Sequence, residues 1–149
     1  MNALLEPTPT QPAEAFKASS NSRRRILVVE DDEALRHLTI EVLISSGCEV
    51  DDADNGLRGW KAIHLKHYDL LITDHEMPEM TGLQLVNKLR QAGFKFPVIF
   101  ASGSLRPYLM AKSTCMNSVT VLPKPFTLDE LRQTVDQLLS AGQPAFANR

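Results

Sequence analysis

Residues 26–32 read Ile-Leu-Val-Val-Glu-Asp-Asp, a short apolar run that leads directly into three carboxylates. Continuous apolar runs of this length are typical of strands in a parallel sheet whose two faces are both covered. The segment Ile26–Val29 is therefore predicted to be a buried strand. The acidic turn after it stands where a dinucleotide-binding protein would carry a glycine-rich turn, and it would repel a pyrophosphate unless a cation intervened.

Apolar runs of strand length recur along the chain and alternate with segments of helical periodicity. Further strands are predicted at Glu49–Asp52, Asp69–Thr73, Pro97–Ala101 and Val119–Leu122. Helices are predicted on four apolar stripes: Leu35, Leu38, Val42 and Leu43; Leu57, Trp60 and Ile63; Leu83, Val86 and Leu89; and Leu128, Leu131, Val135, Leu138 and Leu139. Strand–helix units of this kind favour an α/β fold with a doubly wound, five-stranded parallel sheet.

The last helix is the most clearly marked, because Thr127 and Glu130 form the pattern of a capping box at its start. A further helix at Leu105–Met116 has a poorly defined apolar face, and Pro107 lies near its beginning. That helix is the weakest element of the predicted fold.

A length of 149 residues fits one principal domain. Residues 1–24 are rich in Pro, Thr, Ser and Ala and are predicted to form a flexible leader. Residues 25–140 are predicted to form the domain and residues 141–149 a short tail. Only about ten residues follow Leu139, too few for a DNA-binding or catalytic module, so we expect a stand-alone domain whose output passes through protein contacts.

The composition argues against several classes of function. A net charge of −2 provides no broad basic field for a phosphate backbone, so nucleic-acid binding is not expected. No stretch approaches the roughly 18 apolar residues of a membrane span, and the chain does not begin like a signal peptide, so we expect no membrane insertion and a cytoplasmic location. Cys48 and Cys115 lack the spacing of a metal site, and two reduced, buried thiols are expected.

Polar side chains follow four of the predicted strands, and parallel strands bring their carboxyl ends to one edge of the sheet. Glu30 and Asp31 follow the first strand, Asp74 the third, Ser102 the fourth and Lys124 the fifth. Carboxylates held so close repel one another unless a hard divalent cation neutralises them. Mg²⁺ is the natural candidate, because it binds one or two carboxylates and completes its shell with waters and phosphate oxygens.

This set of residues suits phosphoryl transfer, which needs an in-line nucleophile and neutralisation of the phosphoryl oxygens. Asp74 is predicted to supply the nucleophile, with Mg²⁺ on one side and Lys124 and Ser102 on the other. Taken singly, each residue has a structural explanation: the acidic turn favours a helix dipole, Ser102 is a turn residue, and Lys124 is a solvated charge. Their joint position at one edge favours the functional interpretation.

Four segments resemble the receiver domain of two-component response regulators: Ile26-Leu-Val-Val-Glu-Asp-Asp-Glu, Leu70-Leu-Ile-Thr-Asp-His-Glu-Met-Pro-Glu-Met-Thr-Gly, Pro97-Val-Ile-Phe-Ala-Ser-Gly and Leu122-Pro-Lys-Pro-Phe. The resemblance runs from about Ile26 to Leu139 and implies the flavodoxin-like (βα)5 receiver fold. It also implies that a histidine kinase or histidine phosphotransfer protein phosphorylates Asp74.

The resemblance further implies a role for each residue of the site. Asp31, Asp74 and the backbone carbonyl of Glu76 would bind Mg²⁺, and Glu30 would act mostly through water. Ser102 would be the hydroxyl that moves toward the phosphoryl group, and Lys124 its ion-pair partner. The Lys124–Pro125 peptide bond would be cis.

One position departs from the family pattern. Three residues before the lysine the family usually has Tyr or Phe, whose ring changes rotamer on activation, and here the residue is Val121. Phosphorylation is still expected, but the usual coupling from hydroxyl to aromatic ring is not. His75 follows Asp74, and alternation along the strand directs its side chain away from that carboxylate, so it is expected to be exposed or to face a partner.

The leading interpretation is a signalling switch in which phosphorylation changes the affinity for a downstream protein or for a second copy of the chain. One alternative is a phosphate sink or relay intermediate without conformational output, which Val121 favours. The other is an aspartyl-phosphate phosphatase, which Glu76 disfavours because such enzymes carry a second Asp there. Apart from Mg²⁺-dependent self-phosphorylation and self-dephosphorylation, no enzymatic activity is expected.

Overall fold

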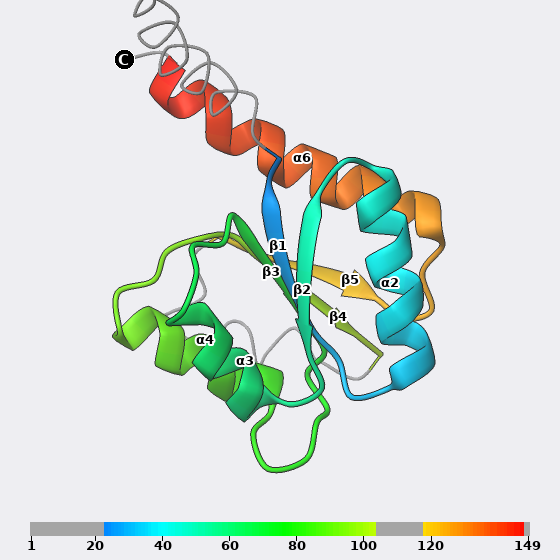
Figure 1. The fold of residues 1–149 in the computed structure, drawn as a ribbon, viewed down its shortest axis with the longest axis vertical. Helices are drawn as coiled ribbons and strands as arrows, with labels where there is room; N and C mark the ends of the chain where they lie inside the picture. Colours follow the sequence, from blue (N-terminus) through cyan, green and yellow to red (C-terminus); the bar gives the residue numbers. More distant parts are fainter. Residues whose placement is uncertain (1–22, 104–117, 148–149) are drawn as a thin grey trace, which may run out of the picture.

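The computed structural model describes residues 23–103 and 118–147, with side chains as far as residue 140 (Figure 1). Its strands are β1 (Arg25–Val29), β2 (Glu49–Ala53), β3 (Leu70–Thr73), β4 (Val98–Ser102) and β5 (Val119–Pro123). Its helices are α2 (Glu33–Ser45), α3 (Gly56–Ile63), α4 (Gly82–Gln91) and α6 (Leu128–Ala147). The helix predicted at Leu105–Met116 lies outside the described residues, and the division into leader, domain and tail stays a prediction.

The five strands form one parallel sheet in the order β2-β1-β3-β4-β5. This confirms the doubly wound α/β fold, and each strand end lies within one residue of its predicted position. Val29 pairs with Ala53 on one side and with Thr73 on the other, so β1 lies between β2 and β3. The strand order reverses between β1 and β3, which places the topological switch point there.

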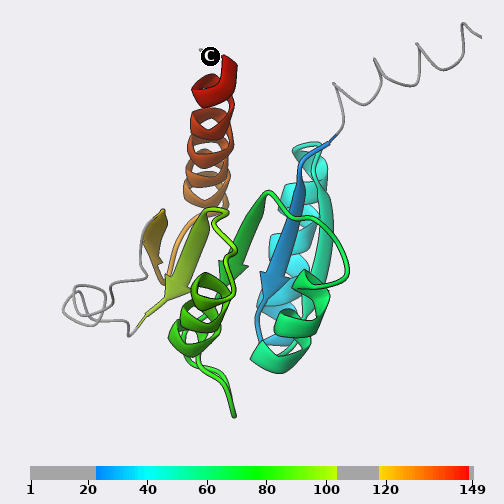
Figure 2. The same cartoon turned by 90° about the vertical axis from the view of Figure 1, so that its left-hand side faces the viewer.

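Helices cover both faces of the sheet. In Figure 1, α2 and α6 lie on one face and α3 and α4 on the other, and Figure 2 looks onto the α3–α4 face. Alternation along β1 divides the core accordingly, because Val29 packs in the cluster that contains Leu85 of α4, and Val28 in the cluster that contains Leu43 of α2. Burial of each such side chain contributes about 1.5–3 kcal/mol, so both layers are needed to hold the strands in place.

Two helices begin with a capping box. At the start of α6, Thr127 Oγ1 accepts a hydrogen bond from the backbone N–H of Glu130 (3.0 Å), and Glu130 Oε1 accepts one from the N–H of Thr127 (2.9 Å). This confirms the capping box that the sequence pattern indicates. Thr81 and Gln84 form the same reciprocal pair before α4 and thereby fix where the loop after β3 ends.

Three residues of the predicted apolar stripes are exposed, and one of them is Leu128 at the start of α6 (39%). Leu38 is 42% exposed because α2 turns Thr39 and Leu43 toward the sheet instead. Leu57 is 45% exposed at the start of α3, where the neighbouring Gly56 is the residue that lies against the core. The stripes therefore identify the helices correctly and their rotation only approximately.

Two expectations from composition concern the same part of the chain. Cys48 is a buried free thiol, as predicted, whereas Cys115 lies outside the described residues. Among residues 23–103 and 118–147, no helix is both long and apolar enough to cross a membrane.

Candidate functional site

The carboxyl ends of β1, β3, β4 and β5 lie along one edge of the sheet, called here the carboxyl edge. Backbone hydrogen bonds tie the residues that follow these strands to their neighbours: the N–H of Asp74 donates to the carbonyl of Val29 (3.0 Å), and the N–H of Lys124 to the carbonyl of Ser102 (3.2 Å). The parallel ladder thus places Glu30, Asp74, Ser102 and Lys124 in consecutive positions across the switch point.

Glu30, Asp31 and Asp74 form an acidic cluster in which one carboxylate oxygen from each residue lies within 4.8 Å of the others. Glu30 and Asp74 are buried, with 5% and 7% of their surface exposed, whereas Asp31 is exposed. The structure therefore brings together the three carboxylates that the sequence predicts to meet. The cluster is closed on the side of the sheet and open to solvent on the side of Asp31.

Glu30 lies deepest in the cluster. Burial raises the pKa of its carboxyl above the ordinary value, and the nearby Asp74 carboxylate raises the pKa further. The backbone N–H of Asp32, which donates to Oε2 at 3.1 Å, and Nζ of Lys124, 3.1 Å from Oε1, act in the opposite direction. The net upward shift means that the bonds from Asp32 and Lys124 do not offset the burial of this carboxylate next to Asp74.

Asp74 is held by the loop that links β3 to α4. The N–H of His75 donates to Oδ1 at 2.7 Å, and the hydroxyl of Thr73 donates to the Asp74 carbonyl oxygen at 2.9 Å. Gly82 closes the loop, since a Cβ atom there would lie 2.1 Å from that carbonyl oxygen. The chain therefore needs a glycine at this point to place the Asp74 carboxylate where it is.

Lys124 reaches the cluster from the loop between β5 and α6. Its Nζ atom lies 3.1 Å from Glu30 Oε1 and 3.5 Å from Asp74 Oδ1. The Lys124–Pro125 peptide bond is cis, as the family resemblance implies. The ammonium thus pairs with two of the three carboxylates, and it lies closer to Glu30 than to Asp74.

The remaining residues discussed for the site lie near the acidic cluster and Lys124; they are Ser102, Glu76 and Val121. Ser102 is buried at the end of β4, one residue beyond Ala101 and next to Lys124 in the edge. Glu76 is exposed in the loop after Asp74. Val121 pairs with Phe100 in the sheet and packs, partly buried, against the core cluster on the α3–α4 side.

His75 is only half-exposed. Its backbone contacts Asp74, but its ring lies near α4, where the N–H of Leu83 approaches Nδ1 at 3.4 Å, and its centroid is 6.4 Å from that of Phe100. The predicted direction away from the carboxylate agrees with these contacts. The ring is part of the packing between the loop and the sheet rather than a freely exposed group.

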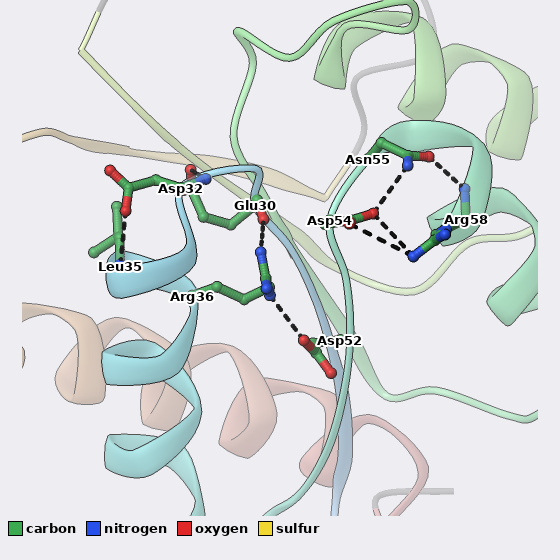
Figure 3. A network of polar contacts seen from close by, with 8 residues as sticks. All are labelled: Glu30, Asp32, Leu35, Arg36, Asp52, Asp54, Asn55 and Arg58. Atoms are coloured by element: carbon green, nitrogen blue, oxygen red, sulfur yellow. Dashed lines mark hydrogen bonds and ion pairs between the residues drawn. The ribbon is translucent and has the colours of Figure 1, made fainter.

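Sequence reasoning missed two residues that build the site (Figure 3). Asp32 is the N-cap of α2, because its Oδ1 accepts from the N–H of Leu35 at 3.0 Å, so it points away from the acidic cluster. Arg36 donates to the backbone carbonyl of Glu30 (2.9 Å) and to Asp52 Oδ2 (2.8 Å). An Asp followed by a helix predicts the cap, but the bond of Arg36 joins residues of different elements and leaves no local sequence signal.

The acidic cluster can bind a metal ion. Its donors are all carboxylate oxygens, which suit a hard divalent cation rather than a soft one. The pKa of Glu30 is raised first by burial and further by the charge of Asp74, and a bound cation would oppose both effects. The open side at Asp31 gives room for ligands that do not come from the protein.

Known proteins with similar sequences are signalling proteins. Residues 26–136 match the response regulator receiver domain. The chain is 35% identical over 121 residues to the transcriptional regulatory protein TctD of Salmonella typhimurium, covering 80% of this chain and 54% of TctD. It is 30% identical over 119 residues to the response regulator receiver protein CpdR of Brucella abortus, covering 80% of this chain and 99% of CpdR. The chain thus spans about half of TctD and nearly all of CpdR.

Solved structures of response regulators and receiver domains have folds similar to that of this chain. The chemotaxis protein CheY4 of Vibrio cholerae superimposes with a TM-score of 0.72 at 25% identity, covering 78% of this chain and 99% of CheY4. The response regulator TrrA of Thermotoga maritima, solved in complex with Mg²⁺-BeF, superimposes with a TM-score of 0.67 at 31% identity, covering 77% and 98%. The receiver domain of the hybrid histidine kinase CckA gives 0.66 at 35% identity, covering 77% and 98%.

Proposed function

We propose that this chain, which belongs to the response regulator receiver domain family, accepts a phosphoryl group on Asp74 from a histidine kinase or a histidine phosphotransfer protein. The observation that carries the proposal is a buried carboxylate at the switch point of the sheet, 3.5 Å from a lysine ammonium and within 4.8 Å of two further carboxylates. Buried carboxylates grouped in this way are uncommon unless they serve chemistry or bind metal.

The geometry of Asp74 suits nucleophilic attack on phosphorus. The N–H of His75 holds Oδ1, which orients Oδ2 as the attacking atom. As the Oδ2–P bond forms, the bond between phosphorus and the donor imidazole nitrogen breaks, and its electron pair leaves with the imidazole. Lys124, already placed beside Asp74, compensates the negative charge of the phosphoryl oxygens, and we assign the Ser102 hydroxyl as a hydrogen-bond donor to one of them.

We assign Mg²⁺ to the acidic cluster. Asp31, Asp74 and the backbone carbonyl of Glu76 are the proposed direct ligands, and Glu30 acts through water. When bound, the ion supplies neutralisation of the phosphoryl charge. Transfer of the phosphoryl group also changes the charges that surround the ammonium of Lys124, which in this structure lies closer to Glu30 than to Asp74.

The proposed output is a change in affinity for a partner protein. Phosphorylation adds about one to two negative charges at a site that is already acidic. The added charge shifts the conformational equilibrium of the elements that Lys124 and Ser102 contact. A receiver domain in the cytoplasm that acts through a downstream protein or through a homodimer is the arrangement that we propose. No enzymatic activity beyond Mg²⁺-dependent self-phosphorylation and self-dephosphorylation is assigned.

Val121 supports a second candidate, a phosphate relay or sink. It fills the position of the family's aromatic switch with a small side chain that packs, partly buried, beside Phe100. A relay would pass the group from Asp74 to a histidine phosphotransfer domain with unchanged partner binding. A switch would change partner binding at least severalfold on phosphorylation.

The test is incubation with Mg²⁺ and acetyl phosphate, followed by intact mass. We expect one acid- and base-labile phosphoryl adduct that is lost in Asp74→Asn and on chelation of the metal. Asp51→Asn is the matched control, since Asp51 lies in the middle of the outer strand β2 and its carboxylate is bonded to Tyr68 rather than to the acidic cluster, and it should be labelled like the wild type. An adduct of equal yield on Asp74→Asn would overturn the proposal.

A further inference from the structure

A second concave site lies at the opposite edge of the sheet from the acidic cluster. It is a groove of about 480 Å³. Arg24, Asp69 and Pro97, which directly precede β1, β3 and β4, lie in its wall together with the loop from Gly93 to Phe96 after α4. We call it the amino-edge groove. Its volume lies in the range of sites that hold small molecules or single side chains with their flanking residues.

The charges that line the groove are mostly positive. Arg24, Lys66 and Lys95 line it together with one carboxylate, Asp69, and Lys66 also lies 3.4 Å from Asp51, which is not part of the lining. The Asp69 carboxylate is already shared, because Arg24 lies 3.7 Å from it and the backbone N–H of Arg25 donates to it at 2.8 Å. Lys95 is exposed, and within residues 23–103 and 118–140 it has no hydrogen bond or ion pair. An anion entering the groove would therefore meet uncompensated positive charge.

The apolar wall of the groove is held in one conformation. Phe94 and Phe96 lie with ring centroids 5.8 Å apart. Arg90 donates to the carbonyls of both residues, at 3.0 and 2.9 Å, and its guanidinium lies 6.0 Å from the Phe96 ring. Because these bonds fix the loop, binding costs little ordering of the protein, and the rings offer a ready surface for an apolar side chain.

The helices beside the groove continue its positive charge. Residues 55–68 contain Arg58, Lys61 and Lys66, residues 80–97 contain Lys88, Arg90 and Lys95, and neither segment contains Asp or Glu. These segments include α3 and α4, which lie side by side on one face (Figure 2). The helices of the other face carry Glu33, Glu41, Asp129, Glu130 and Asp136. A chain with a net charge of −2 thus has one distinctly basic face.

We propose that the amino-edge groove and the adjoining α3–α4 face dock an acidic segment of a partner protein, with one aromatic or long apolar side chain of that segment seated against Phe94 and Phe96. Charge complementarity carries this choice: the cations extend well beyond the groove along both helices, farther than a small ligand reaches. A nucleic acid fits less well, because Asp69 lies inside the groove and the whole chain is acidic.

The experiment uses the full chain labelled with ¹⁵N and two acetylated synthetic peptides. One is built of Asp and Glu around a single Phe, and the other has Asn and Gln in place of the acids. We expect the acidic peptide to shift the amide signals of residues 92–97 and of Lys66 and His67 in a saturable way. Binding should weaken as salt is raised, and the neutral peptide should bind at least about fivefold more weakly.

Two variants with the same change in net charge localise the effect. Lys95→Glu should lower the affinity about threefold to tenfold, whereas Arg132→Glu on α6 should leave it within about twofold. Labelling of Lys95→Glu by acetyl phosphate should be unchanged, which separates this proposal from the function of Asp74. Absence of shifts at residues 92–97, equal binding of the two peptides, equal effects of the two variants, or tighter binding of oligothymidylate at the same amides would each overturn it.

Discussion

Where the strands begin, and along the outer strand β2 with Asp51 at its middle, carboxylates are surrounded by partners, whereas at the carboxyl edge they are not. Asp51 accepts a hydrogen bond from the hydroxyl of Tyr68 at 2.7 Å and lies 3.4 Å from Lys66 and 3.6 Å from Arg25. In the acidic cluster, Glu30 and Asp74 share the ammonium of Lys124, which among residues 23–103 and 118–140 is the one cation that forms an ion pair with the cluster.

The pKa values of Asp51 on β2 and of Glu30 at the carboxyl edge shift in opposite directions. Partial burial acts to raise the pKa of Asp51, but the hydrogen bonds from Tyr68 and Lys66 and the charge of Arg25 outweigh it, so the pKa is lowered. For Glu30 burial wins, and the pKa is raised. The surroundings of Asp51 thus favour its charged form, while those of Glu30 do not offset the burial of its carboxylate.

The largest expected effect comes from a change that breaks the carboxyl edge sterically. Gly82→Ala would place a Cβ atom 2.1 Å from the carbonyl oxygen of Asp74 and should destabilise the protein by about 3 kcal/mol, with loss of labelling by acetyl phosphate. Gly93→Ala is the control near the amino edge, where a Cβ meets nothing within 4 Å and only the positive φ opposes it, at a cost of about 1 kcal/mol. Urea denaturation measures both, and equal losses would contradict the steric argument.

A smaller loss is expected from Asp51, in the middle of β2. Asp51→Asn keeps an acceptor for the Tyr68 hydroxyl but removes the charge that Lys66 and Arg25 face, so the free energy of unfolding should fall by about 1–2 kcal/mol. Glu49→Gln removes a more exposed partner of Arg25 and should change it by no more than about 0.5 kcal/mol. Similar values for the two variants would show that Asp51 is not specially supported.

The same chemical change at the carboxyl edge should have the opposite sign. Asp74→Asn keeps the acceptor for the N–H of His75 and removes one of three mutually repelling charges, so in metal-free buffer it should stabilise the protein by about 1 kcal/mol. Saturating Mg²⁺ should reduce or reverse that difference by stabilising the wild type alone. A loss of stability like that of Asp51→Asn, in metal-free buffer, would contradict the contrast between the edges.

The pH dependence of the free energy of unfolding should distinguish the contribution of Glu30 from that of Asp51. Because the pKa of Glu30 is raised in the folded protein, its contribution is complete below the ordinary value of 4.5 and is lost as pH rises through the raised pKa. The pKa of Asp51 is lowered, so its contribution is present above 3.8 and is lost as pH falls through the lowered pKa. In metal-free urea titrations, Glu30→Gln should abolish the fall in the free energy of unfolding as pH rises from 4.5 through the raised pKa. An unchanged pH profile would contradict this assignment.

The smallest effect on the free energy of unfolding is expected from an ion pair that contacts neither Asp51 nor the acidic cluster. Arg58 and Asp54 form an ion pair at 3.5 Å (Figure 3), with side chains 70% and 44% exposed. Arg58→Ala should change the free energy of unfolding by less than about 0.5 kcal/mol, because solvent screens such pairs. A loss comparable to that of Asp51→Asn would mean that position in the sheet does not decide what a charge contributes.

The sequence predicts the strands and the acidic cluster because both depend on local rules. Four apolar runs flank the edge residues, and the parallel arrangement brings Glu30, Asp31 and Asp74 together whatever the details of the loops. The rotation of α2, which exposes Leu38, depends on packing against the sheet and has no local signal. The same holds for the approach of Lys124 to Glu30, which the loop after β5 determines.

The measurement that most directly tests the assignment of Asp74 is chemical mapping of the phosphorylated residue. Borohydride reduces an aspartyl phosphate to homoserine, and peptide mass spectrometry of the labelled, reduced protein locates the change. We predict homoserine at position 74 alone, only when Mg²⁺ and acetyl phosphate were both present. Homoserine at another aspartate, or unmodified Asp74 in a protein whose intact mass shows the phosphoryl adduct, would contradict the assignment.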